Sequence, residues 1–190
     1  MLTIDRLMDN LSEENITNYL QSIGLLRNAF QCGCGTEMAF NKSNDSRDGV
    51  IFRCNVCWCK KSVRNGSFFA RSRLNLRQIM LLVLYWVLGI QVITAVALTD
   101  VSIIAAIQWY DYCKDVCSAV LLRESSSLGS GGKTTEFYEA SVPKTNHSKL
   151  WKRKVDKDEY FYRKFLAFKA DKPLGNFERF LNDIKIIYSL

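Results

Sequence analysis

The chain has 190 residues and a net charge of +7, with 26 lysines and arginines against 19 acidic residues. That length suits one domain or two small ones, and a basic chain favours a polyanionic partner or an acidic membrane surface. The N-terminus lacks a basic segment followed by an apolar run, which argues against a signal peptide and a secreted, disulfide-bonded protein.

The N-terminal segment, residues 1–31, is predicted to contain one helix over residues 11–23. Ser12 is suited to cap this helix, acidic residues follow it in the first turn, and Gly24 is suited to end it. Its apolar residues fall on one face: Ile16, Tyr19, Leu20 and Ile23. We expect this face to pack against the segment that follows.

Five of the seven cysteines lie between residues 32 and 59. Two close pairs, Cys32 with Cys34 and Cys54 with Cys57, are separated by a hairpin's length of chain. Residues 37–40 and 50–53 are suited to be its strands, and residues 44–49 are rich in turn formers. Two such pairs can place four thiolates around one tetrahedral ion, most commonly Zn²⁺. The pattern predicts a zinc ribbon over residues 32–70.

The choice of ligands leaves an alternative open. The first pair has one residue between its cysteines instead of two, and Cys59 lies close to the second pair. We favour Cys32, Cys34, Cys54 and Cys57, with Cys59 in place of Cys57 as the alternative. Free or disulfide-bonded cysteines are the other interpretation, and disulfides require an oxidising compartment.

A basic stretch follows the cysteines. Asn65-Gly66 predicts a two-residue hairpin turn, so this segment is expected to complete the sheet. No acidic residue occurs from Val50 to Thr99. A stretch of one charge sign this long indicates contact with a phosphate backbone. The basic residues are Arg53, Lys60, Lys61, Arg64, Arg71, Arg73 and Arg77.

Residues 79–98 carry no charge and are long enough to span a bilayer. The alternative is two buried helices over residues 76–88 and 91–98, separated at Gly89. A third helix is then expected, capped by Asp100 or Ser102 and running to about residue 122. Three helices with a short turn before the third form a helix-turn-helix unit over residues 74–123. The third helix has an apolar stripe: Ile103, Ala106, Tyr110, Cys113, Cys117 and Val120. The two cysteines of this stripe are predicted to be core residues.

Residues 124–133 have the composition of a linker. Residues 134–142 are suited to a strand, and residues 176–188 are predicted to form a helix with Phe177, Phe180, Leu181, Ile184 and Ile187 on one face. The only histidine, His147, lies in a basic segment between them and is predicted to be a surface residue.

About two-thirds of the chain, residues 24–142, resembles the N-terminal half of Merlin-superfamily transposases and their bacterial insertion-sequence relatives. The resemblance implies a zinc ribbon, a DNA-binding helix-turn-helix and a following RNase H-like domain that uses divalent metal ions. It also implies that the apolar run is helix-turn-helix core. The motifs that carry it are Cys32-x-Cys34-Gly35-x-x-Met38, Asp48-Gly49, Arg53-Cys54-x-x-Cys57, Ser62-Val63-Arg64-x-Gly66-Ser67-Phe68-Phe69, Ser72-x-Leu74-x-Leu76, Tyr85-Trp86, Trp109-Tyr110-x-x-Cys113-x-x-Val116-Cys117 and Gly132-Lys133-x-x-Glu136-x-x-Glu139.

The chain departs from the family pattern at the position of the first catalytic aspartate. Tyr138 stands there, between Glu136 and Glu139, and the pattern fades after Arg153. A neutral phenol is a poor Mg²⁺ ligand, and the remaining residues are too few for the other acidic ligands. Ala105 also stands where a threonine is usual in the helix-turn-helix. Residues 134–190 are therefore interpreted as a truncated RNase H-like remnant with no catalytic residues.

These observations predict an α+β protein and a transposase-derived, zinc-dependent DNA-binding function. The alternative is an active transposase that cleaves DNA, for which Mg²⁺ would also be needed. Double-stranded DNA is the expected partner, with no membrane; a homo-oligomer is left open. The expected location is the nucleus in a eukaryote and otherwise the cytoplasm. The candidate DNA-binding residues are Lys60, Lys61, Arg64, Arg71, Arg73, Ser102 and Gln108.

Overall fold

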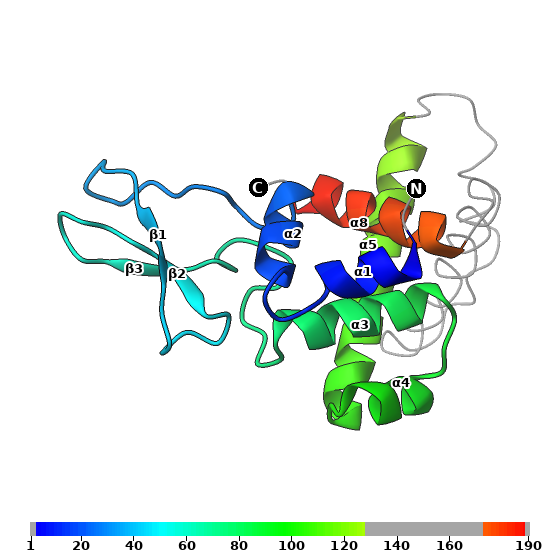
Figure 1. Cartoon of the computed structure of the whole chain (residues 1–190). Coiled ribbons are helices and arrows are strands. Elements are labelled where there is room, and N and C mark those ends of the chain that lie inside the picture. The colour runs from blue at the N-terminus through cyan, green and yellow to red at the C-terminus, as the bar shows by residue number, and fades with distance from the viewer. Residues whose placement is uncertain (1–2, 128–172, 189–190) are drawn as a thin grey trace.

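The computed structural model describes residues 3–127 and 173–188. In these ranges the chain forms six helices and one three-stranded antiparallel sheet, which confirms the predicted α+β class. Figure 1 shows the sheet at one end of the molecule and the helices at the other. In chain order the elements are α1 (Ile4–Asn10), α2 (Ile16–Ser22), β1 (Ala39–Lys42), β2 (Val50–Arg53), β3 (Lys60–Ser62), α3 (Leu76–Val87), α4 (Val92–Thr99), α5 (Ile103–Ser127) and α8 (Pro173–Ile187).

The N-terminal segment contains two short helices. α2 lies within the helix predicted over residues 11–23 but begins five residues later, and α1 was not predicted. Thr3 caps α1, because its hydroxyl accepts a hydrogen bond from the backbone N–H of Arg6 at 3.3 Å. Ser12 lies in the connection, and its buried hydroxyl has no hydrogen-bond partner in the described structure. Asn15 occupies the N-cap position of α2. Gly24 follows α2 in a left-handed conformation, φ +76°, which agrees with its predicted role of ending the helix.

The sheet has the order β1-β2-β3, and β3 is the expected third strand. β1 begins two residues later than predicted, because the residues before it pair with a different segment. Glu37 bridges to Gln31, and the N–H of Met38 donates to the carbonyl of Phe30 at 2.8 Å. The prediction of a hairpin at Asn65-Gly66 was also wrong, because the described chain continues from this turn to α3 without another strand.

The sheet has a small core of its own. Its buried residues are Phe30, Cys32, Met38, Phe52, Cys54 and Val63, and two of these six are cysteines. The helices share a separate and larger core, which includes Phe68 and Phe69 from the segment after β3. The ribbon end of the molecule therefore has little apolar burial to stabilise it.

The apolar run of residues 79–98 is divided between α3 and α4, as the two-helix alternative predicted. Asn75 and Gln78 form a capping box at the start of α3, and Gly89, φ +76°, follows its end. Among the described residues no single helix has the length and hydropathy to cross a bilayer. Taken together, α4 and the first part of α5, Ile103–Val120, have the required length and hydropathy, but the two helices are bent by 120° relative to each other.

α5 begins after Ser102, whose hydroxyl accepts a hydrogen bond from the N–H of Ala105 at 3.2 Å. Asp100, the other candidate cap, instead adopts the left-handed conformation that ends α4. α5 extends to Ser127, so the first four residues of the predicted linker are helical. Its buried stripe includes Trp109 and Val116, whereas Ile103 is 49% exposed and does not belong to it.

α8 brings the C-terminal part of the chain back onto α3 and α5. It matches the predicted helix over residues 176–188 and buries Phe177, Phe180, Leu181 and Ile184. The rings of Phe180 and Trp86 lie 4.9 Å apart, centroid to centroid. α8 is therefore part of the main core. The strand predicted over residues 134–142 and His147 lie outside the described residues.

Candidate metal centre and nucleic-acid surface

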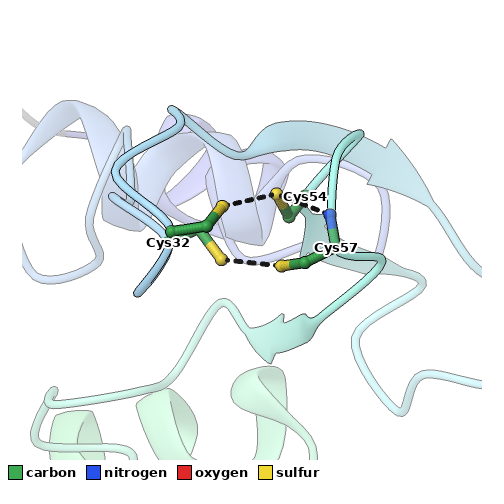
Figure 2. A group of neighbouring side chains, drawn as sticks. Cys32, Cys54 and Cys57 are labelled. Carbon is green, nitrogen blue, oxygen red and sulfur yellow. Dashed lines mark hydrogen bonds between the residues drawn. The ribbon is translucent and has the colours of Figure 1, made fainter.

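The two cysteine pairs meet at the edge of the sheet. The sulfurs of Cys32 and Cys57 lie 3.2 Å apart, those of Cys34 and Cys54 lie 3.5 Å apart, and all four are within 4.8 Å of one another. Figure 2 shows the labelled thiols of Cys32, Cys54 and Cys57 directed into one space between the two loops. Together with Cys34, they are the four cysteines that were predicted to be the metal ligands.

Backbone hydrogen bonds shape both loops. In the first, the N–H of Cys32 donates to the carbonyl of Thr36 at 2.9 Å, and Gly35 takes the positive φ, +85°, that closes the turn. In the second, the sulfur of Cys54 accepts from the backbone N–H groups of Val56 and Cys57, at 3.4 and 3.5 Å. These donors stabilise negative charge on the sulfur that accepts them.

The hydrogen bonds also act on the acidity of the thiols. Thr36 lowers the pKa of Cys34 to about 6, through its hydroxyl and its backbone. The pKa of Cys54 is lowered as well, by the backbone N–H of Cys57 and then by that of Val56. Because a metal ion binds the thiolate and not the thiol, these two shifts favour metal binding. Hydrogen bonds to neighbouring thiols raise the pKa of Cys32 to about 11 and also raise the pKa of Cys57, and these shifts oppose it.

The geometry suits a tetrahedral ion. Four sulfurs at a Zn–S distance of about 2.3 Å would lie roughly 3.8 Å apart, close to the spacing found here. The four cysteines can therefore hold a metal ion. Cys59 is exposed and lies outside this group; its backbone carbonyl accepts from the N–H of Cys54 at 2.9 Å. Cys113 and Cys117 are buried in the helical core, as predicted.

Arg64 is a structural residue, and its assignment to phosphate contact is corrected here. Its side chain is 6% exposed and forms a two-pronged ion pair with Asp48, whose side chain is 4% exposed. A further N–H of the guanidinium donates to the carbonyl of Leu74 at 2.7 Å. All of these partners are within the chain, so the guanidinium is not presented to an external phosphate.

The two lysines of β3 lie on opposite faces of the sheet, since neighbouring residues of a strand alternate. Lys60 is exposed and is the cross-strand partner of Arg53. Lys61 is partly buried: its ammonium donates to the carbonyl of Gln31 at 3.1 Å and lies 5.4 Å from the ring centroid of Phe30. Lys60 is therefore the freer of the two.

The other predicted DNA-binding residues lie on different parts of the surface. Arg71 and Arg73 are exposed in the segment between β3 and α3, and Gln108 is exposed on α5. Ser102 caps α5. The structure does not gather these residues into one site, since the N-terminal part of α5 lies away from the sheet (Figure 1).

The part of α4 and α5 around Gln108 presents an apolar surface and contributes no basic residue to it. Five aliphatic side chains of α4 and α5 are exposed, and no lysine or arginine occurs from Gln78 to Cys113. The absence of basic residues was visible in the sequence, but the exposure was not, because Ile103 was assigned to the buried stripe and residues 91–98 to a buried helix. The exposed residues are Ile93, Leu98, Ile103, Ile104 and Ile107.

The residues of the degenerate catalytic motif, Glu136, Tyr138 and Glu139, lie outside the described residues, so the structure bears on neither their interpretation nor the catalytic alternative. Comparison of the chain with protein-family models, curated proteins and solved structures finds no match.

Proposed function

We propose that this protein is a zinc-dependent DNA-binding protein related to Merlin-superfamily transposases, without catalytic activity of its own. The observation that carries the proposal is the meeting of four cysteines beside a small antiparallel sheet with exposed basic residues. Zn²⁺ is the ion of choice, because a tetrahedral site of four thiolates is typical of structural zinc.

The arrangement of the helices supports the same proposal. α4 and α5 are joined by three residues and bent by 120°, within the range of helix-turn-helix units. In that motif the N-terminal residues of the second helix enter the major groove. Gln108 would then read an adenine edge, and Ile104 and Ile107 would contact thymine methyl groups. Phosphate contacts must come from other residues, since α4 and residues 103–113 of α5 contribute no basic side chain.

Replacing Lys60, Arg71 and Arg73 together by glutamine is expected to weaken binding to all duplex sequences. The slope of log K against log salt should flatten by about 0.9 for each phosphate that the variant no longer neutralises. The measurement is fluorescence anisotropy with a labelled duplex over a range of salt concentrations. Arg64 is left unchanged, because its role is structural.

Gln108→Ala provides the contrasting variant. It should change the preference among sequences more than it changes overall affinity, since a base contact carries sequence information and a phosphate contact does not. If the triple variant binds as tightly as the parent at every salt concentration, the ribbon and the segment after it do not contact DNA. A zinc-loaded parent protein that binds no duplex at low salt would refute the proposed function.

A further inference from the structure

A pocket of about 650 Å³ lies where three distant parts of the chain meet. The segment after α2 contributes Gly24, Arg27 and Asn28, α5 contributes Arg123, and α8 contributes Asn182 and Lys185. Three of these six residues are cations and two are amides. The pocket is separate from the cysteine cluster and from the exposed surface of α4.

The positive charge of this pocket is not neutralised within the described structure. None of its described lining residues is a carboxylate, and Arg27, Arg123 and Lys185 form no ion pair with a described residue. Three like charges brought together by folding repel one another, at a cost that a bound anion removes. The arrangement is therefore suited to an anionic ligand.

The backbone holds one of the cations in place. The N–H of the Arg123 guanidinium donates to the carbonyl of Ile186 at 3.3 Å, which ties α5 to α8. Lys185 lies over Gly24: a Cβ placed on Gly24 would be 2.8 Å from its Cε and 3.0 Å from its Nζ. A larger residue at this position would displace the end of the Lys185 side chain, and the positive φ of Gly24 favours glycine.

Arg27, which lines the pocket, also contacts Phe30 of the sheet's core. The Arg27 guanidinium carbon lies 5.4 Å from the centroid of the Phe30 ring, and the Lys61 ammonium lies at the same distance from it. A line of cations thus leads from Lys61 on β3, past Phe30 and Arg27, to Lys185 and Arg123. Such a line suits a ligand that carries more than one phosphate group, because each phosphate can meet its own cation.

We propose that this pocket binds phosphate groups, and that in the DNA complex it receives the phosphate backbone that the apolar surface of α4 and α5 does not contact. The second half of this inference rests on the proposed function; the first does not. Arg27 and Lys185 supply charge-assisted hydrogen bonds, Asn28 and Asn182 supply amide N–H donors, and Arg123 supplies charge while bonded to α8.

The test uses the zinc-loaded full chain and two probes. Inorganic pyrophosphate is titrated by calorimetry, and a labelled duplex is titrated by anisotropy. We expect Arg27→Gln and Lys185→Gln each to weaken pyrophosphate binding at least about tenfold, the decrease expected when one charge-assisted hydrogen bond is removed. Lys185→Arg should keep most of the affinity, and Asn182→Asp should weaken it by adding a negative charge without removing a cation.

Arg6→Gln is the matched control. It removes the same charge from a neighbouring pocket beside α2 and α8, where Glu178 is also present. Melting temperatures of all variants show whether they remain folded, and Asn182→Asp covers the case in which the removal of a lysine or arginine disturbs the fold.

The two probes separate the possible ligands. Pyrophosphate binding that depends on Arg27 and Lys185, in a protein that binds no duplex, would support the pocket as a site for a small phosphate compound and refute the proposed function. Duplex binding that depends on them without pyrophosphate binding would assign the pocket to the backbone alone. If neither probe distinguishes these variants from Arg6→Gln, the pocket is not a phosphate site.

Discussion

Removing the metal ion is expected to unfold residues 32–63, whereas the helical core around Trp86, which includes Phe68 and Phe69, stays folded. The sheet buries only six residues in its own core, and two of these are the proposed ligands Cys32 and Cys54. Metal binding supplies about 10–16 kcal/mol in zinc-finger peptides near neutral pH, which is more than so small a core provides. The unfolding should appear in two-dimensional NMR spectra as collapse of the ribbon signals after chelation.

Single cysteine variants identify which thiols bind the metal ion. Cys57→Ser should lose the metal, whereas Cys59→Ser, which changes a thiol outside the cluster, should keep one ion per chain by elemental analysis. The opposite pattern would make Cys59 the ligand. Metal should also be released as the pH falls, because protons compete with the ion for the four thiolates. Protein purified without chelator and free of zinc would contradict the assignment.

Replacing Arg64 by glutamine is expected to destabilise the protein by about 3–5 kcal/mol, because it leaves the buried carboxylate of Asp48 without its partner. It also removes a donor from the carbonyl of Leu74, just before α3. Arg64→Lys should rescue little, since an ammonium cannot reproduce the two-pronged contact. Chemical denaturation followed by tryptophan fluorescence measures the change.

Arg71→Gln is the control for this destabilisation. It removes the same charge from an exposed position in the same segment and should change stability by less than about 0.5 kcal/mol. The double variant Arg64→Met with Asp48→Leu should recover much of the stability, because no unpaired charge remains buried. Equal stability of Arg64→Gln and Arg71→Gln would show that the buried ion pair does not stabilise the protein.

Local patterns predicted the parts of the fold that local interactions determine. The cysteine spacing identified the four sulfurs that meet, because each pair sits on a short loop whose geometry its own residues set. Gly89 marked the division of the apolar run, since a positive φ ends a helix. In the N-terminal segment α1 was missed and the start of α2 was predicted too early, because two seven-residue helices are too short to show a clear period.

The features that depend on distant residues could not be predicted. Nothing around Arg64 indicates burial; its partner lies sixteen positions earlier and meets it only in the folded protein. The pocket of Arg27, Arg123 and Lys185 draws on positions far apart along the chain, so no spacing rule would find it. The exposure of Ile104 and Ile107 was missed because apolar side chains are usually assigned to a core.

The place of α8 in the helical core sets the order in which the protein can assemble during synthesis. A chain leaves the ribosome from its N-terminus, so residues 30–63, which form the small core of the ribbon, emerge before most of the helices. The aromatic side chains of α8 that contact Trp86 and its neighbours are made only after α3 and α5. The ribbon can therefore take up a metal ion early, whereas α3 and α5 lack part of their apolar cover until α8 has been made.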